Sequence, residues 1–231
     1  MRRLLHTPFA ALALFAAAVF SQTAPDALLH SGLTEPENHT ITVERLMLYH
    51  DSGEYEREIR EVANAARDYL ESRFKNVRKD EKLAAVFDID ETSLSNWAAM
   101  QDCGFCSYNI QVKYPIDHDP AITPVLELFD YAKERGIAVF FVTGRPETQR
   151  QLTVDNLHEV GYSGWTDLYM QPVPPTGTVK PPAHVFKPQN RQAITDKGYR
   201  IVLNIGDQAS DLSGCCAERV FKLPNPFYLL D

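Results

Sequence analysis

The chain has 231 residues, of which 44% are hydrophobic and 23% are charged. This length allows one α/β domain with an insertion, and the composition excludes a largely disordered chain. The formal net charge is −8 at pH 7, and no long block of Lys and Arg occurs outside the extreme N-terminus. We therefore expect no nucleic acid bound through its phosphate backbone.

Residues 1–21 have the layout of a secretory signal peptide. A basic start, Met1-Arg2-Arg3, precedes an apolar run from Pro8 to Phe20, and small or polar residues follow. We expect cleavage near Ser21 or Ala24 and export to the periplasm or the medium. An uncleaved membrane anchor is the alternative, although the run is short and rich in alanine for a bilayer span. Since no cysteine that could carry a lipid lies near the cleavage region, we expect no stable membrane anchor.

Residues 22–45 are polar and largely unpatterned, and we expect a flexible N-terminal arm that leads into one domain over residues 46–231. Within the arm, Asn38-His39-Thr40 matches a glycosylation sequon. A helix is predicted from Glu54, because apolar residues recur there at steps of three and four, and Asp51 or Ser52 is expected to cap it. The apolar positions are Tyr55, Ile59, Val62, Ala66, Tyr69 and Leu70.

The stretch that organises the chain is a short apolar run, Leu83 to Phe87, followed by two carboxylates at Asp88 and Asp90. The run reads as a strand that is buried on both faces. Alternate residues of a strand share a face, so both acids leave the strand end close together. Open α/β sheets bind their ligands at this carboxyl edge.

Residues 93–118 have no clear period and are predicted to form a small cap inserted over the strand end. Asp119-Pro120 then opens a predicted helix that runs to Arg135. A second buried strand, Ile137 to Val142, ends in Thr143-Gly144-Arg145, and a further helix is expected to about residue 160.

The last third of the chain repeats this alternation. A possible third strand covers Trp165 to Met170, and a proline-rich loop separates it from a helix expected from Lys187 to about Lys197. The strand Tyr199 to Ile205 then leads into Gly206-Asp207-Gln-Ala-Ser-Asp211, and a short final strand covers Arg219 to Leu223. Alternating strands and helices predict a three-layer, Rossmann-like α/β fold, with a parallel sheet and helices on both faces.

In a parallel sheet, the acids at the ends of separate strands meet at one edge. Two carboxylates about 4 Å apart repel by roughly 4 kcal/mol at an effective dielectric constant near 20. Four such groups in one crevice therefore favour a cation among them, and a set of oxygen ligands without histidine suits Mg²⁺. The ion would also allow an anionic phosphate to approach an acidic protein.

These residues also carry a family resemblance. The segments in question are Phe87-Asp-Ile-Asp-Glu-Thr-Ser-Leu-Ser-Asn96, Thr143-Gly-Arg145, Lys187 and Gly206-Asp-Gln-Ala-Ser-Asp211. In this order they resemble the four motifs of the haloacid dehalogenase superfamily, within its acid phosphatase subfamily of plant vegetative storage proteins and bacterial class C outer-membrane acid phosphatases. The likeness extends to Tyr49-His-Asp-Ser-Gly-Glu-Tyr55 and to Phe221-Lys-Leu-Pro-Asn-Pro226, but the lipid-attachment cysteine of the lipoprotein members is missing.

The resemblance implies a role for each motif residue. Asp88 would attack phosphorus and form an aspartyl-phosphate, and Asp90 would protonate the leaving oxygen and then activate water. Mg²⁺ would bind a carboxylate oxygen of Asp88, the backbone carbonyl of Asp90 and the side chain of Asp207, with Asp211 in support. Thr143, Gly144 and Lys187 would bind the phosphate oxygens. Arg145 would either join them or pair with acids at the sheet edge.

Simpler interpretations exist for the same residues. Asp88 and Asp90 alone would suit a turn or a helix cap, Asp207 and Asp211 would suit a cap after a glycine turn, and Lys187 would suit a solvated surface. Lys180 is the only nearby substitute for Lys187, and it lacks the motif context.

Four cysteines in an exported chain permit disulfides: Cys103, Cys106, Cys215 and Cys216. Three pairings are possible and the sequence does not choose among them. A redox or zinc site is disfavoured, because Cys103-Gly-Phe-Cys106 lacks a strand–helix context and adjacent cysteines are poor zinc spacing.

The sequence thus predicts an exported, Mg²⁺-dependent acid phosphatase that hydrolyses small phosphomonoesters. The alternatives are a non-enzymatic storage or phosphate-binding relative and a phosphotransferase that passes the same intermediate to an alcohol. The physiological substrate, the oligomeric state and the pH optimum are not predicted.

Overall fold

A computed structural model describes residues 36–106 and 118–230, and its centre is a five-stranded sheet in the order β3-β2-β1-β4-β5. All neighbouring strands are parallel. The strands are β1 (Lys82–Phe87), β2 (Ala138–Pro146), β3 (Asp167–Gln171), β4 (Tyr199–Gly206) and β5 (Ala217–Lys222). The predicted parallel α/β fold is therefore confirmed, and β1 occupies the middle of the sheet.

The register of the sheet brings the predicted strand ends to one level. Phe87, the last residue of β1, aligns with Phe141 in β2 and with Ile205 in β4. Asp88 and Asp207 therefore emerge at the carboxyl ends of adjacent strands. The prediction that separate motifs meet at this edge depends on this register.

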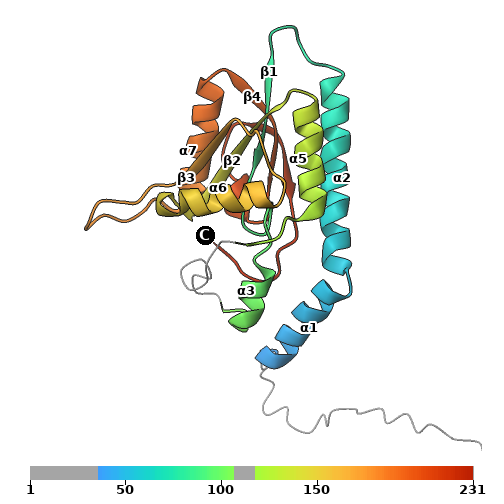
Figure 1. Cartoon of the computed structure of the whole chain (residues 1–231), viewed down its shortest axis with the longest axis vertical. Helices are drawn as coiled ribbons and strands as arrows, with labels where there is room; N and C mark the ends of the chain where they lie inside the picture. Colours follow the sequence, from blue (N-terminus) through green and yellow to red (C-terminus); the bar gives the residue numbers. More distant parts are fainter. Residues whose placement is uncertain (1–35, 107–117, 231) are drawn as a thin grey trace, which may run out of the picture. The chain divides into compact units, whose positions relative to one another are not determined.

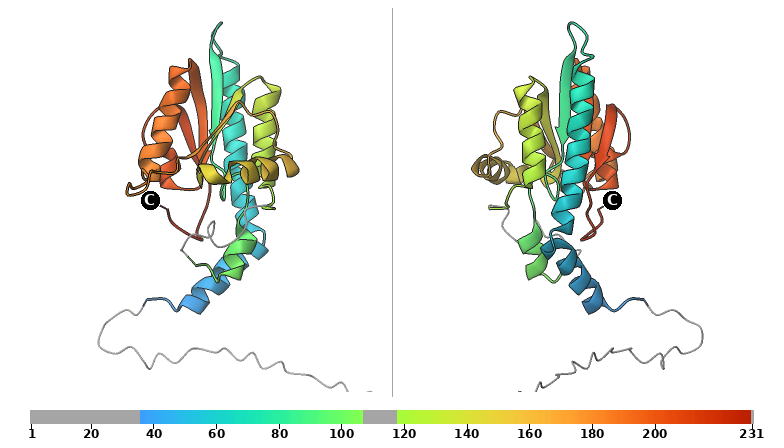
Figure 2. Two further views of the ribbon diagram at one scale, coloured as in Figure 1. Left: turned by 60° about the vertical axis from the view of Figure 1, so that its left-hand side comes forward. Right: turned by 90° about the vertical axis from the view of Figure 1, so that its right-hand side faces the viewer.

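Helices cover both faces of the sheet (Figure 1). On one face, α2 (Glu54–Phe74) and α5 (Thr123–Glu134) pack against a large apolar core that includes Ile59 and Phe129. On the other face, α7 (Ala183–Asp196) packs against a smaller core through Phe186 and Ile194. A view from the side shows α2 and α5 together in front of the strands (Figure 2). A further helix, α6 (Arg150–Glu159), follows β2 after a 3-10 turn.

The predicted flexible arm over residues 22–45 is wrong from His39 onward, because α1 (His39–Asp51) begins there. The side chain of Asn38 caps this helix by accepting a hydrogen bond from the backbone N–H of Thr40 at 2.9 Å. None of the residues of α1 is buried, so the helix has no apolar stripe for a periodicity argument to detect. Residues 1–35, which include the predicted signal peptide, lie outside the described residues.

The expected cap of α2 is confirmed only in part. The N-cap position is Gly53, with a φ of 78° and no side-chain cap, because α1 extends to Asp51 and ends on Ser52. Glycine adopts this left-handed conformation at little cost, which allows the chain to turn between two consecutive helices. Ser52 still contributes, since its hydroxyl oxygen accepts a hydrogen bond from the N–H of Glu54, the first residue of α2, at 3.4 Å.

Two helices begin at other residues than expected. Helix α5 begins at Thr123 rather than at Asp119, because Ala121 pairs with Leu94 and the N–H of Ser95 bonds the carbonyl of Pro120. Helix α7 begins at Ala183, four residues before Lys187, and it contains Pro188.

The part of the predicted cap that the structure describes contains α3 (Trp97–Asp102), and residues 107–117 lie outside the description. The Trp97 ring stacks on the His50 ring with centroids 3.7 Å apart and also contacts Phe105 and Phe227. These rings form a small aromatic core that joins α3 to α1 and to the C-terminal tail. Among the described residues there is no helix both long and apolar enough to cross a membrane.

Candidate active site

A tight turn after β1 presents Asp88 and Asp90. The carbonyl of Ile89 accepts hydrogen bonds from three successive N–H groups, and the Ser93 hydroxyl donates to the Asp88 carbonyl at 2.7 Å. Glu91 has a φ of 50°, which completes the turn. Both aspartates are only 6% exposed, so their carboxylates require partners.

Lys187 is the partner of Asp88. From α7, its ammonium group lies 2.6 Å from Oδ1 of Asp88 and also bonds Oδ1 of Asp211. Burial lowers the pKa of Lys187, but the two carboxylates outweigh burial and raise it above its usual range. Lys187 is 5% exposed, which rules out the solvated-surface interpretation, whereas the alternative Lys180 is exposed.

Asp207 is held from three directions at the end of β4. Its carboxylate accepts hydrogen bonds from Thr92 Oγ1 at 3.2 Å, Gln208 Nε2 at 2.5 Å and Asn225 Nδ2 at 2.6 Å. Burial and the neighbouring charge of Asp211 nevertheless raise the pKa of Asp207 to about 7. These hydrogen bonds orient the group without supplying the positive charge that it lacks.

Asp211 is fixed at both ends. Its Oδ2 accepts a hydrogen bond from the N–H of Gln208 at 2.8 Å, and its carbonyl accepts one from Asn204 Nδ2 at 2.9 Å. It lies so close to Gly206 that a Cβ atom on that glycine would stand 2.5 Å from the Asp211 side chain. Only glycine therefore fits at the end of β4.

The donor set of this cluster fits a hard divalent cation. Carboxylate oxygens of Asp88, Asp207 and Asp211 all lie within 4.8 Å of one another, and all three residues are buried. Lys187 supplies one positive charge to three acids, so two negative charges remain among these four groups when all are ionised. Burial and then Asp211 raise the pKa of Asp88 well above its usual range. An ion such as Mg²⁺ accepts oxygen ligands of this kind and would restore the balance.

Asp90 has different partners from this cluster. Arg145 donates to its Oδ1 from Nη2 at 2.7 Å and from Nε at 3.0 Å, and Asn96 Nδ2 donates at 2.9 Å. Nη2 of Arg145 also bonds Oδ2 of Asp119 at 3.1 Å. Although burial raises the pKa of Asp90, Arg145 outweighs it and lowers the pKa below its usual range. Of the two roles expected for Arg145, the structure therefore shows the pairing with acids.

A cavity of about 170 Å³ opens at this edge of the sheet. Its wall includes most of the predicted site residues, namely Asp88, Asp90, Gly144, Lys187, Asp207 and Asp211. Thr143 and Arg145 are fully buried and do not line this cavity, and the Thr143 hydroxyl accepts a hydrogen bond from the N–H of Arg145 at 3.1 Å. The structure thus brings six of the eight residues together in one wall and places the other two directly behind it.

Several supporting residues were not assigned a role from the sequence. Asn96 orients Asp90, Asn225 orients Asp207, and Asp119 shares Arg145. Asn96 and Asn225 stood inside segments that carry the family resemblance, so that signal was available. Tyr55 was predicted as an apolar helix position and also stands in a segment of the resemblance, but no role was assigned to its hydroxyl, which donates to the buried Glu91 carboxylate at 2.6 Å.

The four cysteines form two local disulfides, Cys103–Cys106 and Cys215–Cys216. This resolves the pairing that the sequence left open. The first bridge closes the turn after α3, and the second joins adjacent residues immediately before β5.

Comparison with known proteins decides the family. The family model for subfamily IIIB of the HAD superfamily, the acid phosphatases, matches residues 31–231. The chain belongs to this family. It is therefore a phosphoric monoester hydrolase, as the motifs predicted.

Relatives agree with this assignment, and a solved structure shows the same fold. The chain is 35% identical to "Acid phosphatase 1" of Solanum lycopersicum over 185 residues, which cover 76% of this chain and 69% of that protein. It is 30% identical to "Vegetative storage protein 1" of Arabidopsis thaliana over 201 residues, or 84% and 72% of the two chains. The fold matches the class C acid phosphatase of Bacillus anthracis with a TM-score of 0.65 at 22% identity, covering 82% of this chain and 86% of that one.

Proposed function

We propose that this acid phosphatase hydrolyses small phosphomonoesters through an aspartyl-phosphate on Asp88, with Mg²⁺ as its cofactor. The observation that carries the proposal is the meeting of three buried carboxylates and one lysine in a single cavity at the carboxyl edge of the sheet. A fold alone does not require so many unbalanced acids, whereas phosphoryl transfer uses a nucleophile, a cation site and a cationic phosphate clamp.

In the first half-reaction, a carboxylate oxygen of Asp88 attacks phosphorus, and the bond from phosphorus to the leaving oxygen breaks. Asp90 in its acid form gives its proton to that oxygen. In the second half-reaction, Asp90 as a carboxylate removes a proton from water, the water oxygen bonds to phosphorus, and the bond to Asp88 breaks. Dividing one displacement in two lets both acids act within one cavity.

Asp88, Asp207 and the backbone carbonyl of Asp90 would hold the metal ion, and Asp211 lies beside them. When bound, Mg²⁺ supplies charge neutralisation for the phosphoryl oxygens and for the acids. Lys187 and the backbone at Gly144 line the cavity and would bind the phosphoryl oxygens. Thr143 would support Gly144 from behind, and Arg145 would act chiefly by holding Asp90.

Removal of metal tests this proposal. EDTA should silence the hydrolysis of an aryl phosphate, and added Mg²⁺ should restore it, while Ca²⁺ at the same concentration should restore much less because it favours longer bonds and more ligands. Activity that is indifferent to EDTA would reject the metal. Adding acceptor alcohols and measuring the products distinguishes hydrolysis from phosphotransfer.

A storage role is the second candidate, because the chain is similar to a protein named as a vegetative storage protein. The presence of Asp88, Asp90, Lys187 and Asp207 in one site favours catalysis. We also propose that the protein is exported, on the strength of the basic and apolar pattern over residues 1–21. N-terminal sequencing of the protein recovered outside the cytoplasm should begin near residue 22 or 25.

A further inference from the structure

We propose that Arg191 is a positioning residue for the phosphatase reaction, which holds the segment after β4 so that Asp211 keeps Lys187 directed at Asp88. This inference rests on the proposed role of Lys187 in binding the phosphoryl group. Arg191 does not itself line the cavity. It contacts the wall only through the backbone carbonyl of Asp211, and on this proposal it does not touch the substrate.

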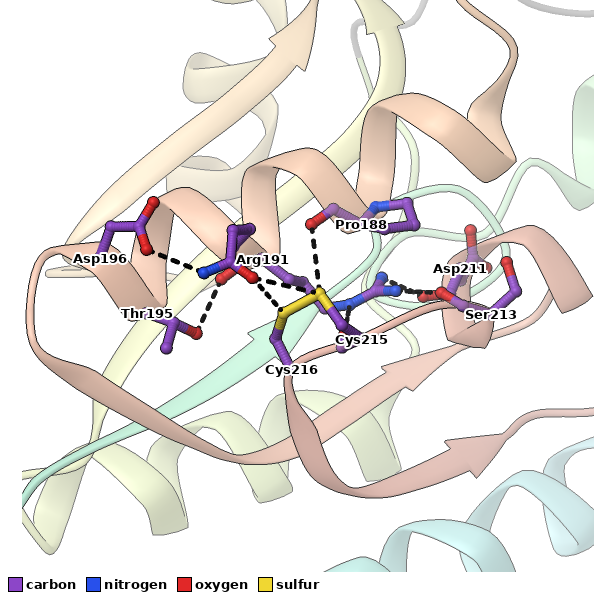
Figure 3. The surroundings of a disulfide bond; sticks show 9 residues. Pro188, Arg191, Thr195, Asp196, Asp211, Ser213, Cys215 and Cys216 are labelled. Atoms are coloured by element: carbon purple, nitrogen blue, oxygen red, sulfur yellow. Dashed lines mark hydrogen bonds between the residues drawn. A yellow bond between two sulfur atoms is a disulfide. The ribbon is translucent and has the colours of Figure 1, made fainter.

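Arg191 lies in α7 one helical turn after Lys187, so both side chains leave the same face of the helix. Its guanidinium group donates to three backbone carbonyls in the neighbouring segment (Figure 3). Nη1 bonds the Asp211 carbonyl at 2.6 Å, Nε bonds the Cys215 carbonyl at 3.0 Å, and Nη2 bonds the Ser213 carbonyl. One side chain thereby fixes three points of the segment.

Burying an arginine among neutral acceptors costs free energy, which indicates a role beyond filling space. Arg191 is 1% exposed, and each of these three acceptors is a neutral carbonyl, whereas the equally buried Arg145 bonds two carboxylates. A buried cation without a directly bonded anion loses hydration that carbonyl dipoles only partly replace. A neutral apolar side chain would fill the same space at lower cost, but it would leave the three carbonyls without donors.

Arg191 and Lys187 donate hydrogen bonds to opposite ends of Asp211. Lys187 bonds the carboxylate of Asp211, while Arg191 bonds its carbonyl, which also accepts from Asn204. The helix α8 (Ala209–Leu212) has only four residues, and a capping box joins Asp211 to Gln208. Because so short a helix is marginal by itself, the donors from Arg191, Asn204 and Lys187 add to that capping box in fixing Asp211.

The segment beyond Asp211 docks directly on α7. Gly214 has a φ of 85°, and a Cβ atom placed on it would stand 2.7 Å from the Pro188 ring. The bridge between Cys215 and Cys216 then fixes the turn that presents the Cys215 carbonyl to Arg191 (Figure 3). The contacts of Arg191 thus join a closely packed helix and loop rather than two mobile surfaces.

Replacing Arg191 should lower kcat, because Lys187 would less often stand where the transferring phosphoryl group needs it. We expect Arg191→Met to reduce kcat about 10- to 100-fold, the range typical for residues that orient a ligand of a metal site. kcat/KM should fall by the same factor, since the lost alignment matters in the transition state. Arg191→Lys should lose less, because one ammonium group can still reach one or two of the carbonyls.

The test measures kcat and KM for an aryl phosphate with saturating Mg²⁺, with rates referred to the folded fraction of each variant. Arg200→Met is the matched control, since Arg200 lies at the opposite end of β4 and is half exposed; its kcat should be unchanged. Each Arg191 variant is also combined with Lys187→Met. If Arg191 acts through Lys187, the double variant should be no more than about twofold slower than Lys187→Met alone.

A lower melting temperature with an unchanged kcat for Arg191→Met would reduce Arg191 to a structural role and overturn the inference. Full multiplication of the two losses in the double variant would also overturn it. If Arg191→Met does not fold, the same cycle with Arg191→Lys decides. Asp88→Asn separates a failure of the proposed function from a failure of this inference. A fully active Asp88→Asn enzyme would contradict the proposed function itself. An inactive Asp88→Asn enzyme together with a fully active Arg191→Met enzyme would contradict only the inference about Arg191.

Discussion

The two ends of the central sheet differ in how far nearby cations neutralise their acidic side chains. At the amino end, Glu81 and Glu218 meet Arg73 and Arg200. Arg73 bonds Glu81 at 2.6 Å and Glu218 at 2.8 Å, and Arg200 approaches both acids. Two acids face two arginines, so the cluster neutralises itself. At the carboxyl end, three acids share Lys187.

The pKa values follow this difference. Burial raises the pKa of Glu218, but hydrogen bonds from Arg73, Arg200 and Tyr69 outweigh it and lower the pKa to about 2. The pKa of Asp207 moves the other way, to about 7, because burial and Asp211 act without an equivalent cation. The amino end thus has a structural role, whereas the carboxyl end keeps the uncompensated negative charge that the proposed cation site and mechanism would use.

The largest expected effect comes from removing the proposed nucleophile. Asp88→Asn should lower kcat for an aryl phosphate by at least about 10³-fold, because an amide oxygen does not form the covalent intermediate. The fold should persist, since the amide still accepts a hydrogen bond from Lys187. Steady-state rates with a circular dichroism melt test this, and Asp167→Asn, at a half-exposed acid outside the cavity wall, is the control. A fully active Asp88→Asn enzyme would reject the mechanism.

The raised pKa at the carboxyl end should make the unfolding free energy depend on pH. The raised pKa of Asp207 means that the unfolded chain releases this proton first, so the metal-free protein should lose unfolding free energy as pH rises from about 4 to about 7. The loss attributable to this group is of order 4 kcal/mol. Urea unfolding in EDTA at several pH values measures it, and Asp207→Asn should flatten the curve. An unchanged slope in Asp207→Asn would show that folding does not raise the pKa of Asp207.

The next effect concerns the pH optimum. In Arg145→Met, Asp90 would keep its burial but lose the guanidinium group, so its pKa should rise. Because the proposed mechanism needs Asp90 in its protonated form to assist the leaving group, the basic limb of the kcat profile should move to higher pH. A profile shifted downward or unmoved, measured with Mg²⁺ saturating at every pH, would contradict the assignment of Asp90 as the acid.

The smallest effect lies at the amino end. Glu218→Gln should lower the unfolding free energy by about 1 kcal/mol, because Arg73 and Arg200 lose a shared partner that lies at the solvent boundary with its side chain 20% exposed. kcat should stay the same, and so should the increase in melting temperature that we expect on adding Mg²⁺. A fall in kcat would mean that the two ends of the sheet are coupled, and it would contradict a purely structural role for the charges at the amino end.

The positions of the acids were predictable because each follows a short apolar strand. Strand periodicity, the rule that parallel strand ends meet at one edge, and the family motifs together located Asp88, Asp90, Asp207 and Asp211. Lys187 was found only through the motifs, because the proline beside it obscured the helix that buries it. Element boundaries were less accurate where a side chain or a β-bridge, as at Ala121, decided the end of a helix.

What the sequence did not reveal depends on long-range contacts. Helix α1 was missed because a helix without buried residues leaves no apolar period. Arg191 gave no signal, since its partners are backbone carbonyls more than 19 positions away in the chain. The pairing of Arg145 with Asp119 joins residues 26 positions apart, and nothing in either local pattern connects them.

The most direct test is a crystal structure of the protein with Mg²⁺ and beryllium trifluoride, which mimics a phosphoryl group on an aspartate. The proposed mechanism predicts that the beryllium atom bonds a carboxylate oxygen of Asp88, that Lys187 lies beside its fluorides, and that Asp88 and Asp207 coordinate one ion. Beryllium bonded to a different residue, or an ion that avoids Asp207, would contradict it.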